Sequence, residues 1–183
     1  RTLDFAKKRG LDLPIVYNTS GYEKKESIKL LDGYIDVYLP DFKYYDESIS
    51  IRYSNSPDYR DYAKESIKEM VKQVGKPKFN EKGYMTKGVI VRHLVLTGLN
   101  EDSKKIIEYL HKEYGEDIYL SIMSQYTPLE QVNKYPEINR KLTEDEYNEV
   151  VDFAISIGVE NGFIQDGESA QESFIPPFNY EGV

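Results

Sequence analysis

Apolar residues in this chain gather in short runs that alternate with longer amphipathic segments. The short runs are typical of buried strands, and we expect strands over residues 13–19, 34–43, 88–98, 117–126 and 161–165. The amphipathic segments repeat their apolar positions about every 3.6 residues, and they predict helices over residues 26–32, 57–75, 100–115 and 142–158. Strands and helices that alternate in this order predict an α/β fold with a parallel sheet.

Local sequence signals predict the ends of two of these helices, one connecting segment and the exposure of one residue. Asn100 is expected to cap the helix that starts with it. Thr143 and Glu146 have the residue types and the spacing of a capping box. Residues 76–88 are expected to form a loop or a small hairpin. His111 lies in mid-helix beside a lysine and is expected to face solvent.

The order of the elements fits either an open doubly wound sheet or a (β/α) barrel. A complete eight-fold barrel needs about 250 residues, whereas this chain of 183 residues supplies about five βα units. We therefore expect a partial (β/α) barrel of the TIM type, in one domain over residues 1–183. The tail, residues 166–183, contains two adjacent prolines and is expected to be irregular.

Composition limits the classes of partner. The chain is 39% hydrophobic and 31% charged, which is the balance of a soluble globular protein. Its net charge of −8 argues against nucleic acid and anionic membranes as partners. No apolar window approaches the roughly 18 residues of a membrane span. The chain has no cysteine, so it forms no disulfide or thiolate metal site, and a cytoplasmic location is expected.

The stretch LPDFKYYD, residues 39–46, places two opposite charges where a predicted strand ends. Side chains alternate along a strand, so Asp41 and Lys43 should point to the same face. They could form an ion pair that closes the sheet, or they could bind opposite charges of an amino-acid ligand. Lys43 could alternatively act as a Schiff-base nucleophile.

A second charge, Arg92, interrupts the apolar run VIVRHLVL. A charge inside a strand needs a partner or a polar cavity, so Arg92 is either part of a structural salt bridge or part of a site. His93 should point to the opposite face. We expect Arg92 to face the barrel interior, because it has the same parity as Leu94 and Leu96.

The stretch NTSGY, residues 18–22, predicts a strand-to-helix turn with Gly21 at a positive φ angle. Such a turn can also present side-chain oxygens or backbone N–H groups to a ligand. Ser20 lacks the G-x-S-x-G context of a hydrolase nucleophile. The chain contains no G-x-G-x-x-G motif, phosphate-binding P-loop or zinc-ligand spacing.

Several ordered stretches resemble radical S-adenosylmethionine (SAM) proteins, and in particular the relatives of pyruvate formate-lyase activating enzymes. They are YNTSGYE, DVYLPDFKYYD, YAKESIKEMVKQVG, GVIVRHLVLTG, YLSIMSQYTP and NGFIQ, followed by the FIPPF tail. The resemblance implies a partial (β/α)6 barrel in which a [4Fe–4S] cluster reductively cleaves SAM to a 5′-deoxyadenosyl radical. It also implies a protein partner, such as a glycyl radical enzyme.

The resemblance assigns the candidate SAM-binding residues. NTSG resembles the family's D-T-N-G turn, with Asn18 in place of the acidic residue, and PDFK resembles its D-L-K. Asp41 would then take the SAM ammonium, and Lys43 would take a carboxylate or ribose oxygen. Arg92 matches the family's strand arginine. The full set is Asn18, Thr19, Ser20, Asp41, Lys43, Arg92, Gln125 and Tyr126.

The chain departs from the family at its front. It contains neither the C-x3-C-x2-C cluster motif nor the Gly-Gly-Glu motif, and residues 1–10 are typical of the second half of a helix. We therefore expect the C-terminal part of a radical SAM enzyme, inactive alone, with SAM and the [4Fe–4S] cluster bound only by the full-length protein. The strand at 13–19 would then be an open edge that forms a homodimer or is covered by the tail.

Two other functions remain open on the sequence. One is a cluster-independent lyase or aldolase barrel that uses Lys43, which borohydride trapping with carbonyl substrates would detect. The other is a non-catalytic interaction domain that binds a protein partner through surface tyrosines such as Tyr44 and Tyr45.

Overall fold

The structure, a computed structural model, describes residues 2–164, so the expected irregular tail and Gln165 lie outside the described residues. The strands are β1 (Val16–Thr19), β2 (Val37–Pro40), β3 (Lys78–Phe79), β4 (Met85–Leu94), β5 (Tyr119–Met123) and β6 (Gly162–Ile164). The helices are α1 (Thr2–Lys8), α2 (Lys25–Lys29), α3 (Glu47–Ser54), α4 (Tyr59–Val74), α5 (Asn100–Tyr114) and α6 (Glu144–Ser156).

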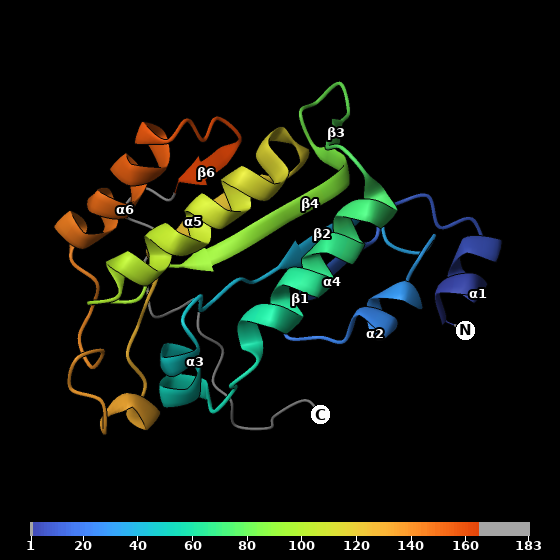
Figure 1. Cartoon of the computed structure of the whole chain (residues 1–183). Coiled ribbons are helices and arrows are strands. Elements are labelled where there is room, and N and C mark those ends of the chain that lie inside the picture. The colour runs from blue at the N-terminus through green and yellow to red at the C-terminus, as the bar shows by residue number, and fades with distance from the viewer. Residues whose placement is uncertain (1, 165–183) are drawn as a thin grey trace.

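The strand order distinguishes between the two expected α/β architectures. Five strands run parallel in the order β1-β2-β4-β5-β6, and β3 forms an antiparallel hairpin with β4. A doubly wound sheet reverses its order and carries helices on both faces. Here the order follows the sequence, and α2, α4, α5 and α6 share one core on one face of the sheet (Figure 1). The sheet is not closed, and the fold is compatible with a partial barrel.

The two faces of the sheet differ in burial. Along β4 and just beyond it, Val89, Val91, His93 and Val95 are buried under the helices. The alternate residues Ile90, Arg92, Leu94 and Leu96 are only half-buried. We call this second side the open face. Arg92 therefore lies on the open face and His93 lies in the core, as the alternation predicted.

Most expected elements are present with shorter bounds, including the hairpin at 76–88 and the capping box of Thr143 and Glu146. Two expectations are wrong, and one helix was missed. The strand over 13–19 was expected to be buried, but Val16, where it begins, is 52% exposed because, within residues 2–164, β1 pairs with β2 alone. Asn100 is the first residue of α5 rather than its cap, and its side chain instead donates a 2.6 Å bond to Glu149. Helix α3 was not expected at all.

Glu146 ties three segments together. Its carboxylate accepts two 2.7 Å bonds from Arg140, one of 2.9 Å from the Gly98 N–H and one of 3.1 Å from the Thr143 N–H. The Arg140 guanidinium, together with these N–H donors, holds the pKa of Glu146 well below its usual range. This carboxylate should therefore stabilise the fold above the pKa of an unfolded glutamate, about 4.5, and lose that effect as the pH falls below it.

We expect Glu146→Gln to lower the free energy of unfolding by about 2 kcal/mol at pH 7, since it removes the charge of a carboxylate that accepts bonds from Arg140 and from two backbone N–H groups. Urea denaturation at pH 7 and pH 4 would measure the difference, which should shrink at the lower pH. Glu144→Gln is the matched control, because this neighbouring carboxylate is exposed, and it should cost less than about 0.5 kcal/mol. Equal losses for the two variants would contradict this account.

Candidate functional site

Two turns that follow neighbouring strands meet at the carboxyl edge of the sheet. The first follows β1 and contains Gly21, and the second follows β2 and contains Asp41. Gly21 has φ +75°, and a Cβ atom added there would lie only 2.1 Å from the Asp41 carbonyl oxygen. The close approach of the two backbones therefore requires a glycine at this position.

Tyr59, at the start of α4, joins the same two turns. Its hydroxyl accepts a 2.9 Å bond from the Lys43 N–H and lies 3.0 and 3.1 Å from the carbonyl oxygens of Ser20 and Asp41. The side chain is 2% exposed, so water does not compete for these bonds. Burial raises the pKa of Tyr59, which keeps the hydroxyl protonated and able to donate.

Asp41 is the centre of a charged cluster on the open face. Its backbone is held on both sides, because Asp41 N donates to Thr19 O and Phe42 N donates to Arg92 O. Asp41 Oδ1 lies 2.6 Å from Arg92 Nη2, and Oδ2 lies 3.5 Å from Lys43 Nζ. Arg92 Nη2 also donates a 2.7 Å bond to Asn18 Oδ1. The structure thus brings together four of the eight predicted residues.

The charges of the cluster do not cancel. One carboxylate faces two cations, so Asp41, Arg92 and Lys43 carry a net charge of about +1 when all are ionised. The Lys43 side chain is 44% exposed and the Arg92 side chain is 26% exposed, although Arg92 Nε itself is buried. The cluster therefore presents positive charge on the open face and is suited to an anionic group, such as a carboxylate or a phosphate.

His93 lies behind the cluster, in the core. It is 4% exposed, and its Nδ1 lies 2.8 Å from the Phe42 carbonyl oxygen, between Asp41 and Lys43 in the chain. Burial lowers the pKa of His93 to about 4, so the ring is neutral near pH 7. A neutral ring that donates from Nδ1 fixes the backbone on which the two charged side chains are mounted.

The other predicted site residues make different contacts. Thr19 is buried, and its hydroxyl donates to Glu23 and accepts from the Gly21 N–H. Ser20 is exposed beside the cluster, and its carbonyl oxygen accepts from Tyr59. In the segment after β5, Gln125 Nε2 lies 3.8 Å from Met123 Sδ, and the Tyr126 hydroxyl donates a 2.8 Å bond to Ile138 O. These contacts orient the two residues within their own segment.

Sequence patterns did not assign Tyr59 or Ser121 to the site, and they placed Tyr44 wrongly on the surface. Tyr59 lies in the helix expected over residues 57–75, where the helical pattern predicted no role in a site. Ser121 pairs with Arg92 in the β4–β5 register and shares its face, and a polar residue in an apolar strand was the available signal. Tyr44 was proposed as a surface tyrosine, but it is 8% exposed and its hydroxyl lies 2.8 Å from Ser54 Oγ.

Comparisons with known proteins identify one similar protein. No protein-family model matches the chain. The chain is 30% identical over 155 residues to the "Uncharacterized protein MJ0674" of Methanocaldococcus jannaschii. The match covers 84% of this chain and 40% of that protein, so the chain spans about two fifths of the relative's length. Neither result bears on the radical SAM resemblance, which stays a prediction.

Across residues 2–164, no group of three or more His, Cys, Asp or Glu side chains is arranged to hold a metal ion. In the same part of the chain, no helix combines the length and the apolar character that crossing a bilayer requires.

Proposed function

We propose that this chain forms the SAM-binding part of an enzyme of the radical SAM type, and that the Asp41–Arg92–Lys43 cluster holds the amino-acid end of SAM. The observation that supports the proposal is the position of Asp41. This carboxylate lies between two cations, on the open face of a parallel sheet, directly after the carboxyl end of β2. Ligand sites of parallel α/β folds lie at that end of the strands.

The amino-acid end of SAM has one carboxylate and one ammonium group, and the cluster offers complements to both. Lys43 Nζ and the partly exposed Arg92 guanidinium would bind the carboxylate. Asp41 Oδ1 is buried, so Oδ2, at 3.5 Å from Lys43 Nζ, would accept from the ammonium. The half-buried apolar residues Ile90 and Leu94 lie on the same face and would contact the rest of the ligand.

The two cofactors implied by the resemblance differ in how they fit this chain. The charged cluster fits the zwitterionic end of SAM. An iron–sulfur cluster does not fit, because it is held by cysteine thiolates and the chain contains no cysteine. The function proposed for these residues is therefore the binding and orientation of SAM. We propose radical chemistry on a protein partner, in the cytoplasm, only for a longer protein of which this chain would be a part.

Binding of SAM to the 183-residue chain, measured by isothermal titration calorimetry, tests this proposal. We expect Lys43→Ala and Arg92→Ala each to weaken binding by about tenfold or more, since each removes a charge-assisted contact. Lys105→Ala is the matched control. Lys105 is 49% exposed and lies 3.1 Å from Asp46, so it is a similar ion pair outside the cluster. Its loss should leave SAM affinity unchanged.

The alternatives give different results in the same experiment. No measurable SAM binding, or equal weakening by Lys105→Ala and Lys43→Ala, would refute the proposal. A Schiff-base enzyme would instead form a borohydride-stable adduct with a carbonyl compound, and Lys43→Ala would abolish it. The structure gives that alternative little support, because an amine nucleophile must be uncharged, whereas Lys43 is half-exposed and lies in an ion pair.

A further inference from the structure

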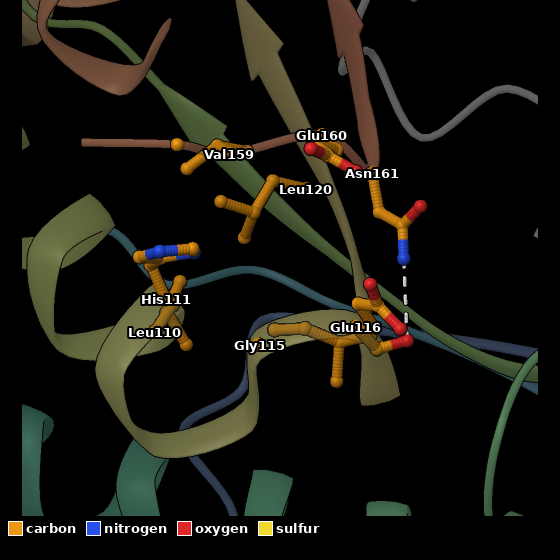
Figure 2. A pocket seen from close by; sticks show the side chains of 10 residues that line it. Leu110, His111, Gly115, Glu116, Leu120, Val159, Glu160 and Asn161 are labelled. Carbon is orange, nitrogen blue, oxygen red and sulfur yellow. Dashed lines mark hydrogen bonds between the residues drawn. The ribbon is translucent and has the colours of Figure 1, made fainter. Parts of the chain in front are cut away.

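A cavity of about 160 Å³ lies at the end of the sheet opposite to the charged cluster. Its walls come from the carboxyl end of α5, from the turn that follows it and from the segments that lead into β5 and β6 (Figure 2). Parallel strands all begin at the same edge, so this cavity opens at the amino edge, whereas Asp41 follows the carboxyl end of β2. The two sites are therefore separate.

The inner wall of the cavity is apolar. Leu110, Ile118 and Leu120 line it and are 0%, 1% and 5% exposed, and Val159 adds a half-buried side chain. Two glycines, Gly115 and Gly158, line the cavity without filling it. An apolar cavity of about 150 Å³ can hold a benzene molecule, which has six non-hydrogen atoms. A cavity of about 160 Å³ therefore suits a ligand of about five non-hydrogen atoms with an apolar body.

The rim of the cavity is acidic. Glu116 and Glu160 are exposed, and neither forms an ion pair within the described part of the chain. Asn161 Nδ2 donates a 3.2 Å bond to Glu116 O, which joins the turn after α5 to the start of β6. Figure 2 shows Glu116 and Glu160 on one side of the cavity and His111 on the other. His111 was expected to face solvent, but it is half-buried here.

We propose that this cavity binds a small primary alkylamine, whose alkyl chain lies against Leu110, Leu120 and Val159 and whose ammonium group lies between Glu116 and Glu160. Apolar walls select the alkyl body, because its burial removes apolar surface from water. The two unpaired carboxylates select a cation over a neutral or anionic head group of the same shape. The proposal does not depend on SAM binding.

The probe is n-butylamine, titrated into the 15N-labelled 183-residue chain at pH 7 and followed by two-dimensional NMR. We expect saturable shifts at the amides of Gly115, Leu120 and Asn161, with a dissociation constant in the low millimolar range. n-Butanol has the same shape without the charge and should bind about fivefold or more weakly. Butyrate should give no saturable shift.

Charge variants distinguish binding in the cavity from attraction of the amine to the overall negative charge of the protein. Glu160→Gln and Glu116→Gln should each weaken butylamine binding about threefold to fivefold. Glu113→Gln removes the same charge from an exposed position of α5 that does not line the cavity, and it should have no effect. The proposal is overturned by equal affinities for butylamine and butanol, by equal effects of Glu113→Gln and Glu160→Gln, or by the absence of saturable shifts up to about 50 mM.

Discussion

Gly21→Ala is expected to lower the free energy of unfolding by about 3 kcal/mol or more, because a methyl group at this position has no space. Its Cβ would lie 2.1 Å from a backbone oxygen, that of Asp41, and a backbone atom cannot move aside as a flexible side chain can. The two turns would have to separate. We therefore also expect the variant to lose SAM affinity, because Asp41 and Lys43 lie on the displaced turn.

Gly33→Ala is the matched control for Gly21→Ala. Gly33 has φ +77°, almost the same as the +75° of Gly21, but a Cβ there would meet nothing within 4 Å. Gly33→Ala should therefore lower the free energy of unfolding only by the left-handed backbone penalty of about 1 kcal/mol. Urea denaturation would measure the free energy of unfolding of both variants. The difference between their losses is the cost of the contact with the Asp41 carbonyl oxygen. Similar losses for the two would mean that the turns can separate at little cost.

The sequence could predict those features of the site that depend on alternation within one strand. Arg92 and His93 are neighbours, so a strand must turn them to opposite faces, and they lie on the open face and in the core. The same rule placed Asp41 and Lys43 together, and the structure pairs them at 3.5 Å. Local periodicity needs no knowledge of the rest of the chain.

Contacts between distant segments could not be predicted in this way. The pairing of Asp41 with Arg92 depends on the register between β2 and β4, which the intervening α3, α4 and hairpin leave open. Tyr59 has the helical spacing of an apolar core residue, and its ring does lie in the core. The role of its hydroxyl arises only because two loops converge above it.

Helix α3 shows a second limit of sequence patterns. In its sequence ESISIRYS the apolar residues Ile49, Ile51 and Tyr53 alternate, which is the period of a strand rather than of a helix. Its Ile49 and Tyr53 pack against the core, and contacts with a distant segment also hold it. Arg52 lies 2.6 Å from Glu137, the Tyr53 hydroxyl donates a 2.9 Å bond to the same carboxylate, and the Tyr135 hydroxyl donates a 2.6 Å bond to Arg52 O. Tertiary packing outweighs local propensity in such a short helix.

The buried His93 should make the fold sensitive to acid. Its pKa is about 4 in the folded protein, mainly because burial disfavours the charged ring, and about 6.5 when unfolded. The unfolded state therefore binds a proton first. Stability contributed by the neutral ring is complete above about pH 6.5 and is lost as the pH falls toward 4. At about 1.4 kcal/mol per pH unit, this residue should remove about 3 kcal/mol between pH 7 and pH 4.

His93→Asn tests this prediction, because the asparagine amide can replace Nδ1 as the donor to Phe42 O and does not titrate. The variant should be less stable at pH 7, since it leaves space where the ring was. Its free energy of unfolding should nevertheless fall by about 3 kcal/mol less than that of the wild type between pH 7 and pH 4. Carboxylates such as Glu146 titrate in both proteins, so the difference between the two pH profiles isolates His93. Parallel profiles, or an NMR titration of the His93 ring near pH 6.5 in the folded protein, would show that the ring is not buried in its neutral form.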